Sequence, residues 1–127
     1  MTSKNKLGIW MDYSEAHIIA DERQDSEAAF IYNTFKHEYM EYAVIKGEEL
    51  MYQKIQQHLA AYYKKICDVI ILYKEVLLFG PTDAKTELLN IVNADLRFEN
   101  IKVEIQTSDK MTEIQKQTFV QSLFALQ

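Results

Sequence analysis

The chain has 127 residues, 26% of them charged and 48% hydrophobic, and these proportions are typical of one globular domain spanning residues 1–127. Its 14 basic and 19 acidic side chains give a net charge of −5, so we do not expect a protein that holds naked nucleic acid mainly through its phosphates. The single cysteine excludes an internal disulfide framework, and no apolar run approaches the roughly 18 residues of a membrane-spanning helix, so we expect a cytoplasmic protein.

The first predicted elements are two short strands joined by a polar turn. Residues 7–11 and residues 16–20 are mostly apolar, and residues 12–15 between them are typical of a hairpin turn. A polar stretch at residues 21–27 follows, and residues 28–35 have the composition of a third antiparallel strand. The chain therefore begins with a predicted three-stranded meander.

The middle of the chain contains one ambiguous stretch and one long predicted helix. Residues 36–46 mix aromatic, aliphatic and charged side chains, and no single periodicity predicts their structure. From Glu48 the hydrophobic residues recur every three or four positions, which indicates one face of a helix reaching Tyr73. Residues 69–73 are also rich in β-branched side chains, so a buried strand there is the alternative. A straight helix of this length is long for a domain of this size, and we expect a bend or break near residues 67–68.

Four further elements complete the predicted order. Residues 75–80 predict a buried strand that ends at a glycine, and a helix follows to about residue 93. Residues 101–105 alternate strictly between apolar and polar side chains, which indicates a half-exposed strand. Thr112 and Gln115 have the spacing of a capping box, which opens a last helix. We expect the packing side of that helix to contain Ile114, Phe119, Leu123 and Leu126.

The order of these elements, β-β-β-α-β-α-β-α, predicts an α/β fold. Right-handed crossovers place the fourth strand beside the first and the fifth strand outside the fourth. The result is a mixed five-stranded sheet in the order 3-2-1-4-5 with helices on both faces. This is the ribonuclease H-like arrangement.

Three segments of the chain resemble a known family. Residues 76–88, VLLFGPTDAKTEL, resemble a signature of small bacterial proteins related to the archaeo-eukaryotic class 1 release factors. Residues 107–113, TSDKMTE, resemble the next block of that family, and residues 8–17, GIWMDYSEAH, resemble its opening hairpin. The resemblance covers nearly the whole chain except residues 33–47. It implies the fold of the release-factor middle domain, a translational machinery component, and a ribosome-associated role.

The sequence departs from the release factors at their functional tripeptide. Release factors carry Gly-Gly-Gln in a loop of the middle domain, where it assists hydrolysis of peptidyl-tRNA, and this sequence contains no Gly-Gly-Gln. We therefore expect no peptide release by that mechanism, no catalytic residue carried over from the family and no cofactor. The expected partner is the ribosome or a tRNA.

A candidate binding site lies where the parallel strands of the predicted sheet end. Open α/β sheets usually bind ligands at the carboxyl ends of their parallel strands. Helix amides, the Thr82 hydroxyl and the Lys85 ammonium would hold a phosphate there. In the alternative, Thr82 only caps its helix and Lys85 lies in solvent. The candidate binding residues at this edge are Asp12, Thr82, Asp83, Lys85 and Asp109.

A metal-dependent nuclease or phosphoesterase is the alternative function. Ribonuclease H-like folds host two-metal nucleases, in which several carboxylates converge on Mg²⁺. Asp12, Asp83 and Asp109 are the candidate ligands, with a contribution from Glu48 or Glu49. Acidic residues are also favoured in hairpin turns and in the first turns of helices, where they need no metal. We therefore expect no metal ion.

Three further features of the sequence invite a structural explanation. Residues 30–45 are more aromatic than a connecting loop requires, which indicates an interface for a ribosomal partner or a second copy of this chain, with Tyr39 and Tyr42 as candidates. The alternative is an added strand or short helix on the core. Histidines 17, 37 and 58 are too widely spaced for a metal motif, so we expect structural or surface roles for them. Cys67 is expected to be a small buried residue.

Overall fold

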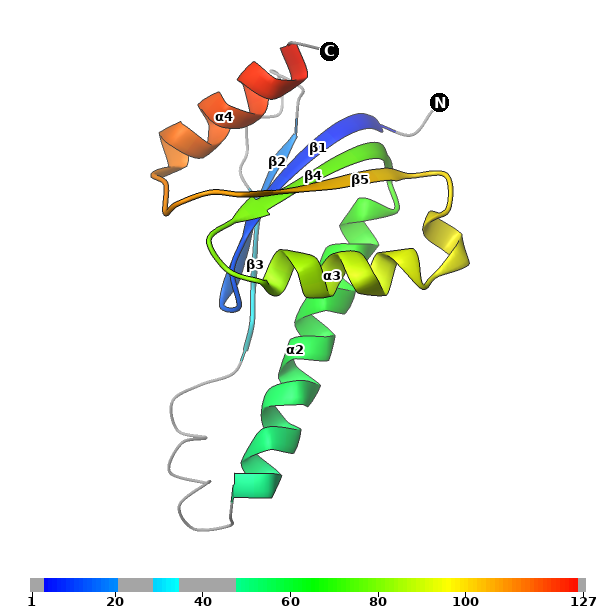
Figure 1. The fold of residues 1–127 in the computed structure, drawn as a ribbon, viewed down its shortest axis with the longest axis vertical. Helices are drawn as coiled ribbons and strands as arrows, with labels where there is room; N and C mark the ends of the chain where they lie inside the picture. The colour runs from blue at the N-terminus through cyan, green and yellow to red at the C-terminus, as the bar shows by residue number, and fades with distance from the viewer. Residues whose placement is uncertain (1–3, 21–28, 35–47, 126–127) are drawn as a thin grey trace.

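The computed structural model describes residues 4–20, 29–34 and 48–125, which form a five-stranded sheet with helices on both faces (Figure 1). The strand order is β3-β2-β1-β4-β5, so the predicted order is confirmed. The elements in chain order are β1 (Lys4–Met11), β2 (Glu15–Ala20), β3 (Ala29–Tyr32), α2 (Glu48–Ile70), β4 (Tyr73–Gly80), α3 (Ala84–Asn93), the 3₁₀ helix η1 (Leu96–Phe98), β5 (Lys102–Thr107) and α4 (Glu113–Ala125).

The sheet is antiparallel on one side of β1 and parallel on the other. β2 pairs with β1 and β3 in antiparallel fashion, whereas β4 runs parallel to both β1 and β5. Trp10 lies at the junction, opposite His17 of β2 and Phe79 of β4. Parallel neighbours cannot be joined by a tight turn, which is why α2 and α3 each connect one strand to the next.

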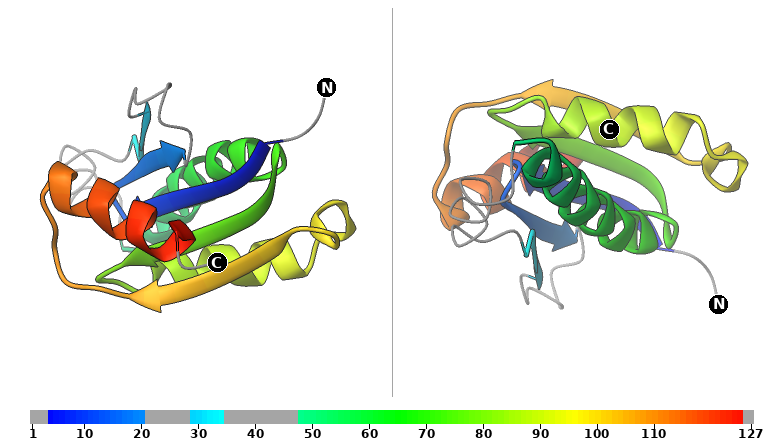
Figure 2. Two further views of the ribbon diagram at one scale, coloured as in Figure 1. Left: turned by 90° about the horizontal axis from the view of Figure 1, so that it is seen from above. Right: turned by 90° about the horizontal axis from the view of Figure 1, so that it is seen from below.

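The larger hydrophobic core lies between the sheet and the helices α2 and α3. Leu7, Ile9 and Met11 alternate along β1 and all face this side, as the two-residue period of a strand requires. Tyr62 and Ile66 of α2 are fully buried against them. In Figure 2 both helices lie on the face seen from below.

The opposite face of the sheet is covered by α4, which Figure 2 shows from above. The smaller core on this face combines Trp10, Ile19, Leu77 and Phe79 of the strands with Val120 of α4. Gly8 also faces α4, and an ideal Cβ on Gly8 would lie 2.9 Å from Val120 Cγ1 and closer still to Cγ2. The helix therefore packs on the sheet at a distance that leaves no room for a side chain at Gly8.

Helix α2 differs from its prediction at its end. It runs without a break from Glu48 to Ile70 and so ends three residues before the predicted Tyr73. The Ile71 N–H donates to the Cys67 carbonyl and the Leu72 N–H to the Val69 carbonyl, and these bonds finish the helix before β4 begins at Tyr73. Of residues 69–73, for which a buried strand was the alternative prediction, only Tyr73 lies in a strand.

Helix α4 begins as predicted but packs through other residues. The Gln115 N–H donates to Thr112 Oγ1 (3.1 Å) and the Thr112 N–H to Gln115 Oε1 (2.9 Å), which confirms the capping box. Ile114, however, is 76% exposed, so its predicted packing role is wrong. The buried positions are Lys116 and Val120, which lie one helical turn apart, and Ile114 points away from them. Phe119 packs at the edge of the smaller core, while the side chain of Leu123 and all of Leu126 fall outside the described part of the chain.

Candidate functional site

The carboxyl ends of β1, β4 and β5 meet at one edge of the sheet, as predicted. The Ser108 N–H after β5 donates to the Gly80 carbonyl at the end of β4 (3.1 Å). Gly80 has a φ of +150°, and a Cβ on it would overlap the Met11 carbonyl oxygen at the end of β1. Only glycine allows this close approach, so Gly80 holds the three strand ends together.

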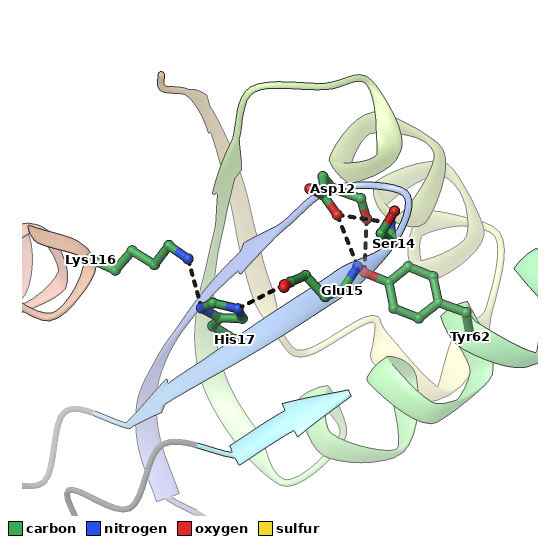
Figure 3. A network of polar contacts seen from close by, with 6 residues as sticks. All are labelled: Asp12, Ser14, Glu15, His17, Tyr62 and Lys116. Atoms are coloured by element: carbon green, nitrogen blue, oxygen red, sulfur yellow. Dashed lines mark hydrogen bonds and ion pairs between the residues drawn. The ribbon is translucent and has the colours of Figure 1, made fainter. Parts of the chain in front are cut away.

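Asp12 shapes the hairpin turn at this edge. Its Oδ1 accepts hydrogen bonds from the N–H groups of Ser14 (2.8 Å) and Glu15 (2.9 Å), and its backbone carbonyl accepts one from the Tyr62 hydroxyl (2.8 Å; Figure 3). Burial and the nearby Asp12 charge raise the pKa of Tyr62, so the hydroxyl remains a donor. The Asp12 carboxylate therefore organises the turn, a structural role that aspartate often has, while the Asp12 backbone carbonyl anchors the turn to α2.

The loop before α3 is held by local hydrogen bonds of Thr82 and Lys85. The N-cap position of α3 is occupied by Asp83, whose side chain makes no capping hydrogen bond. Thr82 Oγ1 instead accepts from the Ala84 N–H at 3.3 Å. Lys85 is only 3% exposed, and its ammonium donates to the Thr82 carbonyl. The expectation that Lys85 lies in solvent is wrong, and the ammonium is already engaged in holding the loop.

The three candidate metal ligands lie on loops of the same edge without forming a metal site. Asp83 and Asp109 are exposed, and the Asp12 carboxylate is engaged by the turn. Among residues 4–20, 29–34 and 48–125, no group of three histidine, cysteine, aspartate or glutamate side chains is close enough to hold a metal ion. The described part of the chain thus gives the nuclease alternative no support.

A hollow of about 620 Å³ opens where β5 passes into α4. This volume lies in the range of ordinary ligand pockets. Its lining includes Asp109, Lys110, Ile114 and Phe119. Ser108 is also a lining residue, and its hydroxyl oxygen is buried without a hydrogen-bond partner among the described residues. The candidate residue Asp109 is exposed and borders this hollow.

A polar cluster joins α4 to the sheet, and sequence reasoning missed it. Lys116 Nζ lies 2.7 Å from His17 Nδ1 and 3.7 Å from the centroid of the Trp10 ring, and His17 Nε2 lies 3.4 Å from Glu15 Oε2 (Figure 3). Burial, followed by the Lys116 charge, lowers the pKa of His17, and burial lowers the pKa of Lys116. A neutral His17 accepts from Lys116 through Nδ1 and points its Nε2 hydrogen toward Glu15.

Aromatic side chains continue from this cluster across β3. The His17 ring lies 5.2 Å from Trp10 and makes an edge-on contact with Phe30 at 4.4 Å, and Phe30 stacks with Tyr32 at 6.2 Å. Phe30 and Tyr32 are exposed on this face. They are the part of the predicted aromatic interface that the structure describes, since Tyr39 and Tyr42 fall outside the described residues.

Comparison with known proteins adds structural neighbours. No protein-family model matches the sequence, and no curated protein matches it. The chain is similar to the crystal structure of the Thermoplasma acidophilum Pelota protein, with a TM-score of 0.51 and 13% identity over 88% of this chain and 30% of that one. The fold is shared with archaeal Pelota. The Archaeoglobus fulgidus Pelota structure gives a TM-score of 0.51 and 12% identity over 98% of this chain and 34% of its own.

The chain spans about a third of the length of these Pelota structures. At 12–13% identity the similarity shows a common fold. Membership of the small bacterial release-factor relatives, to which the sequence bears a resemblance, stays a prediction.

Proposed function

We propose that this chain is a translation-associated protein that binds the ribosome or a tRNA in the cytoplasm and does not itself catalyse peptide release. The observation that carries the proposal is the fold, since 88–98% of the chain superposes on part of Pelota, a release-factor-like translation protein. The resemblance of three sequence segments to release-factor relatives supports the same function independently of the fold. These segments are residues 8–17, 76–88 and 107–113. The sequence contains no Gly-Gly-Gln, which is the reason for a binding role without catalysis.

The carboxyl-end edge of the sheet is the surface that we assign to this binding. Asp12 and Lys85 hold its two loops in shape. Asp83 is exposed on the loop before α3, and Asp109 and Lys110 present exposed polar groups in the lining of the 620 Å³ hollow. With a net charge of −5, the chain does not attract bare phosphates over its whole surface. Binding therefore depends on local hydrogen bonds at this edge and on the positive charge of Lys110.

A second copy of this chain is the alternative partner, through Tyr39 and Tyr42. The exposed Phe30 and Tyr32 on the edge strand favour an aromatic contact of this kind.

None of the helices in the described ranges is both long and apolar enough to cross a membrane.

Co-sedimentation with ribosomes over a series of salt concentrations tests the proposed function. We expect the wild-type protein to pellet with one subunit at moderate salt and Lys110→Glu to be lost from the pellet. Lys64→Glu is the matched control, because it makes the same charge change at an exposed position of α2, away from the edge. Absence of the wild-type protein from every ribosomal fraction at low salt, together with no retention by immobilised tRNA, would overturn the proposal.

A further inference from the structure

A second hollow lies on the α2 and α3 side of the hairpin turn. Its volume is about 610 Å³. The turn, the end of β3, one side of α2 and the first turns of α3 all contribute to it. The described residues that carry the argument are Tyr13, Tyr52, Ile55, Leu59 and Glu87. We call this hollow the tyrosine cleft.

The carboxylate of Glu87 is held in place by two tyrosines. The Tyr13 hydroxyl donates to Oε2 (2.9 Å) and the Tyr63 hydroxyl donates to Oε1 (2.8 Å). Burial and the contact with Glu87 raise the pKa of Tyr13 to about 12 and also raise that of Tyr63, so both hydroxyls stay protonated near neutral pH. Each carboxylate oxygen retains a further lone pair for another donor, and Glu87 is itself exposed.

The described lining of the tyrosine cleft combines the charged side chain of Glu87 with the aromatic rings of Tyr13 and Tyr52. Of the described residues that line it, Glu87 alone is charged. Tyr52 is 63% exposed and Tyr13 38%, so both rings are accessible. Aromatic faces attract cations, and a carboxylate accepts charge-assisted hydrogen bonds from them. A phosphate group would instead be repelled by Glu87.

The apolar part of the lining selects among cations. Ile55 and Leu59 of α2 lie beside the aromatic rings and suit the methylene stem of a long side chain. A guanidinium group is planar, stacks on aromatic rings and presents several donors to a carboxylate. The net charge of −5 of the whole chain also favours approach of a basic partner.

We infer that the tyrosine cleft binds an arginine side chain from a basic segment of a partner protein. The guanidinium group donates to the free lone pairs of Glu87, and its planar face stacks on Tyr52 or Tyr13. This inference rests on the cleft alone and not on the proposed ribosome binding. Failure of co-sedimentation therefore leaves it standing, and failure of the peptide experiment leaves ribosome binding standing.

Titration of the isotope-labelled protein with short peptides, followed by NMR, tests the inference. The probe is acetyl-Gly-Arg-Gly-amide, and the matched peptide carries citrulline, which has the shape of arginine without its charge. We expect the arginine peptide to shift the backbone amides of residues 13–14, 52–59 and 87, and the citrulline peptide to leave them unchanged. Glu87→Gln should weaken binding about tenfold or more, because a charge-assisted hydrogen bond is lost.

Two further protein variants and one comparison ligand, the nucleotide AMP, complete the design. Glu99→Gln removes one negative charge at an exposed position outside the cleft lining and should bind the arginine peptide like the wild type. Tyr52→Ala changes an exposed side chain and should weaken binding about threefold through loss of the cation–π contact. The inference is overturned by equal binding of the citrulline peptide, by unchanged affinity in both Glu87→Gln and Tyr52→Ala, or by AMP occupying the cleft more tightly than the arginine peptide.

Discussion

Gly8 sets the distance between α4 and the sheet. Val120 is fully buried above it, and a Cβ at residue 8 would overlap the valine methyl groups. Overpacking of this kind costs about 1–3 kcal/mol, whereas the lower unfolded-state entropy of alanine gains only about 0.4–1 kcal/mol. We therefore expect Gly8→Ala to lower the free energy of unfolding in urea by about 1–2 kcal/mol. In a Val120→Ala background the same change should cost much less, and equal costs in the two backgrounds would contradict the packing argument.

A single carboxylate oxygen contributes two hydrogen bonds to the hairpin turn. Asp12 Oδ1 accepts from two backbone N–H groups, of which that of Ser14 belongs to an exposed residue that water can reach after mutation. Asp12→Ala should therefore cost about 1 kcal/mol, near the middle of the range for such hydrogen bonds. Asp12→Asn keeps an oxygen acceptor and should cost less than half of that in the same denaturation measurement. An Asn variant as unstable as the Ala variant would show that the charge, and not the acceptor, stabilises the turn.

At the scale of elements, α4 is attached to the sheet partly through a titratable contact. His17 faces the Lys116 ammonium and the Glu15 carboxylate, and Glu113 of α4 also acts on it electrostatically. Because burial and Lys116 lower its pKa below the ordinary 6.5, the folded state binds the proton less readily than the unfolded state. The stability that neutral His17 provides is therefore complete above pH 6.5 and is lost as the pH falls through the folded pKa.

The measurement is the free energy of unfolding of the wild type and of His17→Gln between pH 8 and the acid range. The wild type should lose stability below about pH 6.5 more steeply than the variant, since glutamine cannot titrate. Parallel pH profiles would exclude His17 as the source of the acid sensitivity.

Most elements were predictable because their signals are local. The capping box of α4 and the apolar run of residues 7–11 that predicts β1 depend on residues a few positions apart, and both predictions are confirmed. The packing face of α4 was not predictable in this way. Lys116 is buried because it meets His17, which lies 99 positions away, and no local pattern distinguishes it from a solvated lysine. Ile114 misled the prediction because hydrophobicity alone does not reveal which side of a short helix packs.

The candidate site was predictable to the level of the sheet edge. Topology alone places Asp12, the loop before α3 and Asp109 at the carboxyl ends of parallel strands, and the contact of Ser108 with Gly80 confirms that two of these strand ends meet. The role of Lys85 was not predictable, because its burial depends on how the loop turns back over the side chain. The tyrosine cleft was also missed, since Tyr13, Tyr52 and Glu87 come from three separate elements.

For the whole molecule, charge and fold together determine the kind of partner that is expected. The fold is shared with about a third of the Pelota structures, while the net charge of −5 argues against a surface that binds nucleic acid through phosphates alone. A protein that contacts few phosphate groups releases few counterions from a nucleic acid when it binds. We therefore expect the proposed ribosome binding to weaken less between low and moderate salt than that of a basic RNA-binding protein, as measured by the fraction that co-sediments.

The absence of Gly-Gly-Gln from the sequence and of a three-ligand metal group from the described residues leads to a final prediction about chemistry. The purified protein should neither release peptide from peptidyl-tRNA on ribosomes nor cleave RNA in the presence of Mg²⁺. A gel assay of RNA incubated with the protein and Mg²⁺ checks the second statement, with Asp12→Asn as the comparison. If the wild type cleaves RNA and Asp12→Asn does not, the Asp12 carboxylate binds a metal in addition to shaping the turn, and the nuclease alternative replaces the binding role. If neither protein cleaves RNA, the result agrees with a structural role of the Asp12 carboxylate in the hairpin turn and with the proposed binding role of this edge of the sheet.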